Sequence, residues 1–208
     1  MSRKLRTVAL VAALALPMSS QGSAQQPRAD ADWPCVQRKV PELSVAQVWS
    51  GPEIEAALQG WRSDAEVADL AAELAARRLP IEEAETAIKS FAEEIEEKEK
   101  SEKLTELFAG VFALLDGERT DVMDGIERYG RRQKQMAEEI RERQSQLSDL
   151  RTASPDAPDA AKLNDELLAE VRVFNDRQTS LTYVCEVPTL IEQRLFALGR
   201  AISNLLPD

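Results

Sequence analysis

The chain has 208 residues, of which 26 are basic, 37 are acidic and none is histidine, so its net charge is −11 at pH 7. This acidic excess disfavours binding to nucleic acid and to anionic lipid over most of the surface. Without histidine the usual general base near neutral pH is missing, and no glycine-rich phosphate loop, nucleophile elbow or metal-ligand quartet is present. We therefore predict no enzyme, no cofactor and no catalytic, cofactor-binding or metal-binding residue.

Residues 1–24 have the three parts of an export signal. Three basic residues lie within the first six positions, residues 8–16 are apolar, and residues 22–24 are small, as at a cleavage site. A transmembrane anchor is the alternative, but the apolar run is about half of the roughly 20 residues that span a bilayer, and Pro17 interrupts it. We expect cleavage near Ala24, a periplasmic location and no stable membrane insertion afterwards.

Cys35 and Cys185 are the only cysteines. A lipid-anchored cysteine would directly follow the apolar run, and Cys35 lies too far downstream. Two distant thiols without histidine make a poor zinc site, and neither a CxxC motif for thiol exchange nor a CxxCH motif for haem is present. In an exported protein a disulfide is the default. We therefore expect a Cys35–Cys185 bridge, with free thiols or an intermolecular bond as alternatives.

Helix signals begin at residue 44. Residues 44–49 predict a short helix, and Pro52 suits the first turn of a second one that extends to Leu58. Residues 63–66, Ser-Asp-Ala-Glu, match a capping box in which Ser63 caps an alanine-rich helix to about Leu79.

The next apolar pattern extends from Pro80 to Ile95 and resumes over residues 104–115 at spacings of three and four. The charged stretch between them, residues 96–103, is either an exposed span within one helix or a short break. Asp116-Gly117 is expected to end the pattern. Acidic residues 93–102 could bind divalent cations, but mixed Glu and Lys at helical spacing usually form a solvated, ion-paired face, which we prefer.

Two longer helices follow, at about 121–151 and 159–187, separated by the proline-containing connection 154–158. They read as an antiparallel hairpin with arms of roughly 45 Å. Heptads alone do not separate such a hairpin from a dimer, so a homodimer stays an alternative. The first arm steps by four and three through Val122, Ile126, Tyr129, Gln133, Met136, Ile140, Arg143, Leu147 and Leu150, where the buried glutamine would fix the register.

A last helix is expected over residues 188–206, packed back onto the bundle. The disulfide would fasten the N-terminal segment to the hairpin, so that Trp33, Val36 and Val40 cover apolar surface. The predicted fold is all-α, an elongated helical bundle that contains a long antiparallel coiled-coil hairpin and is pinned by one disulfide. We divide the chain into a cleaved signal (1–24), an extended segment (25–43) and one helical domain (44–208).

The densest basic cluster of this acidic chain lies around Tyr129 and Gly130, and the glycine would permit a close approach. The cluster is a candidate contact for an anion or an acidic partner. We favour internal pairing with glutamates of the helix at 81–102. Its members are Arg128, Arg131, Arg132 and Lys134.

Residues 33–44 (WPCVQRKVPELS), residues 49–52 (WSGP) and residues 125–133 (GIERYGRRQ) resemble a family of exported, mostly uncharacterised helical proteins of Gram-negative bacteria. The resemblance covers most of the mature chain. It implies export and an all-helical fold. The function of that family is unassigned, so no site residue transfers from it.

We expect a periplasmic, non-catalytic structural or protein-interaction protein that presents a rigid helical hairpin to another envelope or periplasmic protein, and not to nucleic acid. The alternative is a chaperone-like or ligand-binding module that uses apolar grooves between helices. Exposure of Phe108, Val111 and Phe112 would favour the alternative, whereas their burial would favour the structural role.

Overall fold

The computed structural model describes residues 32–154 and 158–207. Every regular element within these ranges is helical, which confirms the all-α prediction. The predicted signal, residues 1–24, lies outside the described residues. The elements are α1 (Val45–Val48), α2 (Glu55–Gly60), the 3-10 helix η1 (Trp61–Ser63), α3 (Ala65–Ala75), α4 (Ile81–Glu94), α5 (Glu97–Ala153) and α6 (Pro158–Ser203).

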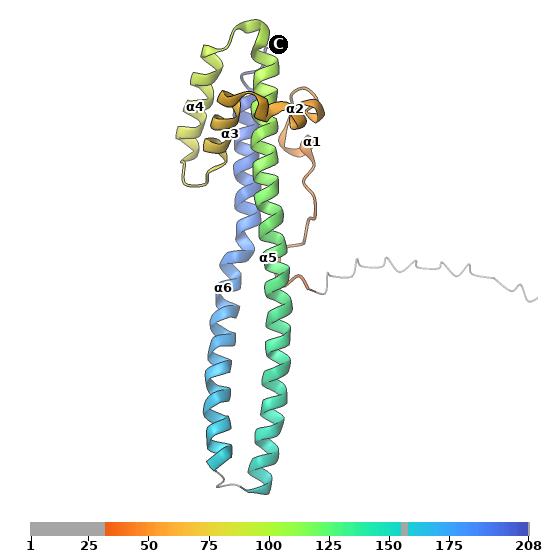
Figure 1. The fold of residues 1–208 in the computed structure, drawn as a ribbon, viewed down its shortest axis with the longest axis vertical. Helices are drawn as coiled ribbons and strands as arrows, with labels where there is room; N and C mark the ends of the chain where they lie inside the picture. The colour runs from red at the N-terminus through yellow and green to blue at the C-terminus, as the bar shows by residue number, and fades with distance from the viewer. Residues whose placement is uncertain (1–31, 155–157, 208) are drawn as a thin grey trace, which may run out of the picture.

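The two long helices form an antiparallel hairpin, as predicted (Figure 1). Its arms exceed the expected bounds, because α5 alone has 57 residues and is therefore roughly 85 Å long. Helices α1 to α4 pack around one end of the hairpin (Figure 1). We call this end the head. Residues 131–153 and 158–181 form the other end, which we call the distal hairpin.

The expected break at Asp116-Gly117 is wrong, because α5 continues through both residues. A glycine within a helix costs only about 1 kcal/mol relative to alanine. On either side of Gly117, Leu115 is buried in the main core of the head and Arg119 is buried against α6 and residues 40–41. Packing of these two side chains outweighs the weak local preference of the glycine.

The expected start of a separate helix at Pro188 is also wrong, because α6 includes this proline. A proline removes one backbone hydrogen bond and costs about 3 kcal/mol in a helix interior. Pro188 and its neighbours Cys185 and Ile191 are buried. The helix therefore continues because its apolar face packs on both sides of the proline.

Two of the expected helix boundaries are confirmed, although at another helix start the capping residue differs from the predicted one. Helix α4 begins directly after Pro80, and a two-residue break at Ile95 and Glu96, both extended, separates α4 from α5. The prediction that Ser63 caps α3 is wrong, because the side chain of Asp64 caps this helix instead.

Asp64 also ties α3 to α5. Its Oδ1 accepts hydrogen bonds from the Glu66 and Val67 amides at 3.0 and 3.2 Å, and its Oδ2 accepts one from Lys103 Nζ at 2.6 Å. The Lys103 hydrogen bond, with the amides, lowers the pKa of Asp64. The second carboxylate oxygen thus joins two elements, which a serine cap could not do.

The main core fills the head between α1 to α4 and the two long helices. Trp49 stacks on Phe108 with ring centroids 4.1 Å apart. Gly110 allows α5 to approach α3, because a Cβ there would lie 2.9 Å from both Ala71 Cβ and Trp61 Cε3. This apolar core is what positions the proximal half of the hairpin.

The distal hairpin has a smaller core of Ile140, Leu147, Ala160 and Leu167. Gln133 lies at its inner end, where its Nε2 donates to the Phe174 carbonyl oxygen at 3.4 Å. These buried residues follow the predicted seven-residue spacing.

Gly117 and Gly110 provide a matched test of this packing. We expect Gly117→Ala to stabilise the protein by about 0.5–1 kcal/mol, because no atom lies near the new methyl group and alanine favours the helix. Gly110→Ala should destabilise it by about 1–3 kcal/mol through overpacking. Urea denaturation measures both. Equal effects would contradict the assigned contacts.

Candidate functional site

Residues 32–43, which we call the strap, contain no helix or strand. They lie beside the middle of the hairpin and continue along α5 to α1 in the head (Figure 1). Because the strap lacks its own backbone pairing, its position depends on contacts with α5 and α6.

A disulfide fixes the strap to α6. Cys35 and Cys185 are bonded, although 150 residues separate them, and their Cα atoms lie 5.6 Å apart. The predicted pairing is confirmed, and no cysteine is free. The Trp33 side chain spans the cysteine, because its Nε1 donates a hydrogen bond to the Gln37 carbonyl oxygen at 2.7 Å.

Gly130 is where the strap crosses α5. A Cβ at this position would overlap the Asp32 carbonyl oxygen and lie 3.0 Å from Pro34 Cδ. Any larger residue would displace the strap, since the overlapping atom belongs to the backbone. The glycine within the basic cluster therefore serves the close approach of the chain's own N-terminal segment.

The basic cluster pairs with the strap, so the expected pairing with the 81–102 helix is wrong. Asp32 Oδ1 accepts a hydrogen bond from Lys134 Nζ at 3.3 Å, and Asp32 Oδ2 lies 3.5 Å from Arg131 Nη1. Glutamates of α4 are in the head, far along α5 from the cluster (Figure 1). Arg128 and Arg132 are exposed and form no ion pair among the described residues, and their anion or partner contact stays a prediction.

Arg119 is the main polar anchor of the strap, and sequence reasoning missed it. The residue is 1% exposed. Nε donates to Glu192 Oε1 at 2.7 Å, while the two Nη atoms donate to the carbonyl oxygens of Val40 and Pro41. Arg119 thus joins α5, α6 and the strap. Its position seven residues before Ile126 was the available signal, because that spacing places it on the buried side.

Polar and covalent contacts hold most of the strap, and Leu43 at its end packs against the main core. Lys39 pairs with Glu127 on α5. Val36 is fully exposed and Val40 is 46% exposed, so the expectation that they cover apolar surface is wrong. Only Trp33 of the three is partly buried.

A second arginine ties α6 to the end of α3. Arg194 donates twice to the Leu74 carbonyl oxygen, at 2.7 and 2.9 Å, and once to that of Leu79 at 2.8 Å. Leu74 lies in the last turn of α3 and Leu79 lies between α3 and α4, so neither carbonyl has a donor within a helix. Burial lowers the pKa of Arg194.

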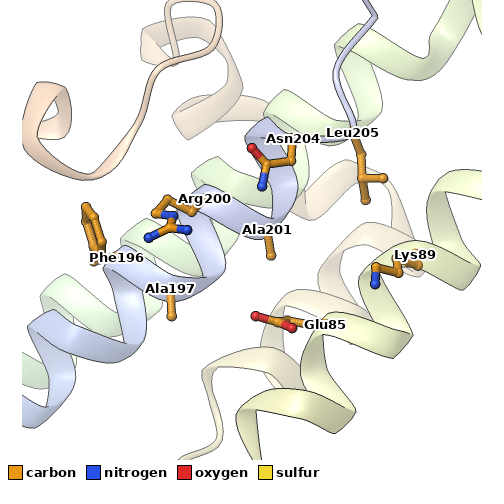
Figure 2. Close-up of a pocket in the computed structure, with 8 residues that line it drawn as sticks. All are labelled: Glu85, Lys89, Phe196, Ala197, Arg200, Ala201, Asn204 and Leu205. Atoms are coloured by element: carbon orange, nitrogen blue, oxygen red, sulfur yellow. The ribbon is translucent and has the colours of Figure 1, made fainter.

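A groove between α4 and α6 opens on the head, with a volume of about 320 Å³. Figure 2 shows Glu85 and Lys89 on one side and Arg200 and Asn204 on the other. The Arg200 guanidinium lies 5.6 Å from the centroid of the half-exposed Phe196 ring. Both charge signs are present, so the groove does not select an anion or a cation.

A second hollow lies where α3 meets the start of α5, and it is acidic. Asp64, Glu102 and Glu106 line it together with Lys103. Burial, followed by the charges of Glu102 and Asp64, raises the pKa of Glu106. Within residues 32–154 and 158–207, no group of three or more Cys, Asp or Glu side chains is arranged to hold a metal ion.

Comparison with known proteins finds no family model, no curated protein and no solved structure that matches the chain. None of the described helices is long and apolar enough to cross a membrane.

Arg119 and Arg77 distinguish the buried anchor from a surface ion pair. Arg119→Met should lower the free energy of unfolding by about 3 kcal/mol, because it leaves the Glu192 carboxylate and two strap carbonyls without their hydrogen-bond donor. Arg77→Met, which removes a half-exposed pair with Glu118, should cost about 1 kcal/mol or less. Urea denaturation at pH 7 measures both, and similar losses would contradict the anchoring role.

Proposed function

We propose that the protein is a non-catalytic structural or protein-interaction protein of the periplasm that presents its helical hairpin to another protein. The observation that carries this proposal is the distal hairpin. Residues 131–153 of α5 lie beyond Gly130, and the matching part of α6 lies beside them. This portion extends roughly 35 Å from the strap. None of α1 to α4 covers it (Figure 1).

Rigidity of the hairpin supports this role. The Cys35–Cys185 bridge and the buried Arg119 fix the strap across both long helices near the middle of their length. A binder that is already ordered loses less conformational entropy on association than a flexible one. The head and the strap would therefore act as the base that holds the hairpin in one orientation.

Burial of the head core argues against the chaperone-like alternative. Phe108 and Val111 are fully buried, and Phe112 is 8% exposed. A holdase that captures unfolded clients needs a contiguous apolar surface. The residues that would have supplied it instead hold α3 and α1 against the hairpin.

The disulfide supports the proposed location. Disulfides persist in oxidising compartments such as the periplasm and are rare in the cytosol. The non-catalytic assignment rests on the chain's lack of histidine and on Arg119, the most buried charged residue in the described part of the chain, which makes structural contacts.

Site-specific photocrosslinking in Gram-negative cells tests the proposal. We would place p-benzoylphenylalanine at Ser145 or Val173 in the distal hairpin, and at Glu73 in the head as a matched exposed control. Crosslinks to another protein should form from the hairpin positions in the periplasmic fraction, whereas Glu73 should give few or none.

Crosslinks from Glu73 alone, or retention of the whole protein in the cytoplasm, would contradict the proposal. An aggregation assay gives an independent check. Suppression of client aggregation by an equimolar amount of the purified protein would favour the chaperone-like alternative instead.

A further inference from the structure

The two ends of the strap are held by different kinds of contact. At the end nearest the head, the buried Arg119 donates to the carbonyl oxygens of Val40 and Pro41. Leu43, the last residue of the strap, packs against the main core. Separating this end from the hairpin would leave a buried guanidinium without two of its acceptors, which is unfavourable. This end therefore does not depend on the disulfide.

The opposite end of the strap, residues 32–38, does depend on it. Asp32 pairs with Arg131 and Lys134, but the side chains of these two partners are 50% and 55% exposed. Exposed ion pairs contribute little to stability, because water screens both charges. The Cys35–Cys185 bond is therefore the main contact between residues 32–38 and the hairpin.

The disulfide is open to solvent on one side. A hollow of about 170 Å³ lies beside it and is lined by both cysteines together with residues of the strap and of α6, among them Gln178, Thr182 and Glu186. Cys185 is only 6% exposed, whereas Cys35 is partly exposed. A small thiol can therefore reach Cys35 Sγ through the hollow, while Cys185 stays largely covered.

Access to one sulfur is what thiol–disulfide exchange requires. The reaction begins when a thiolate attacks a disulfide sulfur, and its rate depends on access to that sulfur. Shielded structural bridges resist reduction, and exposed ones are the labile or regulatory bridges. In this protein the accessible sulfur, that of Cys35, belongs to the weakly held end of the strap, which can move away once the bond breaks.

We propose that the Cys35–Cys185 bond is a thiol-exchange site at which a dithiol oxidoreductase reduces the folded protein. One thiolate of the reductant attacks Cys35 Sγ, the bond between the two sulfurs breaks, and Cys185 leaves as a thiolate that takes up a proton. The second thiol of the reductant then attacks the mixed disulfide and releases Cys35, which also ends as a thiol. Two electrons and two protons pass to the protein, and the reductant becomes a disulfide.

Reduction acts at the base of the projecting hairpin. It lets residues 32–38 leave α5 at Gly130, where the Asp32 carbonyl oxygen lies in close contact, and α6 at Leu181, which is 5% exposed and borders the same hollow. The hairpin then loses the clamp between its braced and projecting halves. This inference rests on the proposed function, to which it adds regulation, because a looser base makes the hairpin a less ordered binder.

Reduction kinetics of the folded chain test the site. Dithiothreitol is added to the oxidised protein, free thiols are alkylated at intervals, and the products are weighed by mass spectrometry. The folded protein should react at no less than about a tenth of the rate of the urea-unfolded protein, because exchange needs no unfolding. Reduction more than ~1000-fold slower than in urea would overturn the proposal, since the bond would then open only with global unfolding.

A pair of variants tests access through the hollow. Thr182→Trp should slow reduction of the folded protein by at least ~5-fold, because the larger side chain obstructs the path to Cys35. Thr179→Trp is the matched control, since Thr179 is exposed on the same helix and does not line the hollow, and it should change the rate by less than about twofold. Both variants should react like the wild type in urea. Equal effects in the folded state would overturn the assigned path.

Trypsin cleavage measures release of the strap. Reduction should accelerate cleavage after the exposed Arg38 by at least ~10-fold, because the released segment fits a protease more readily. Cleavage after Arg77, which is exposed between α3 and α4, should not change. Unchanged cleavage at Arg38, or equal acceleration at both residues, would overturn a release confined to the strap.

Trapping tests the protein reductant. A thioredoxin whose second active-site cysteine is replaced by serine cannot complete the exchange and should stay linked to Cys35. Absence of this adduct, or a link to Cys185, would overturn the proposal. These outcomes leave the proposed function standing, because hairpin crosslinks are measured without any reductant. Absence of hairpin crosslinks from a readily reduced protein would instead overturn the proposed function and leave the exchange site.

Discussion

The pairing of α5 with α6 is the contact on which every other part of the structure depends. Two helices alone bury one stripe each, so most of a long hairpin faces water and little apolar area is removed from solvent. At one end of the hairpin, the head buries additional apolar area because α1 to α4 pack around both helices. The other end has a much smaller buried cluster, formed by Ile140, Leu147, Ala160 and Leu167.

The strap compensates for this thin packing near the middle of the hairpin. It uses a covalent bond to α6, the Arg119 hydrogen bonds and a crossing at Gly130. In the chain-entropy model, a bridge across so long a loop stabilises the fold by about 5 kcal/mol, chiefly by restricting the unfolded chain. The strap therefore divides the hairpin into a braced half and a projecting half, and this division is what gives the molecule a candidate binding element.

Local sequence patterns predicted the parts of the fold that local physics controls. The seven-residue spacing placed Ile126, Gln133, Ile140 and Leu147 on the buried side, where the structure has them. Two cysteines allow one intramolecular pairing, so counting was sufficient for the disulfide. Pro80 marked a real helix start because proline suits the position before the first turn.

Tertiary packing decided the features that the sequence did not predict. Gly117 and Pro188 are unfavourable in a helix, yet buried neighbours keep both helices continuous. The partners of the basic cluster lie in the strap, about a hundred residues away, and no local pattern links Asp32 to Lys134. Arg119 lies between the two predicted helices, which end at Asp116-Gly117 and begin at about residue 121, although its seven-residue spacing from Ile126 places it on the buried side.

Hydrogen exchange, measured on the oxidised protein and on a Cys35→Ser/Cys185→Ser double variant, tests the division most directly. In the oxidised protein, amides of α5 at residues 104–133 should exchange at least ~10-fold more slowly than those at 140–150. In the double variant, exchange should accelerate at residues 126–136 and 178–188, while residues 104–115 keep their protection. Uniform exchange along α5, or identical profiles for the two proteins, would contradict a hairpin braced by its strap.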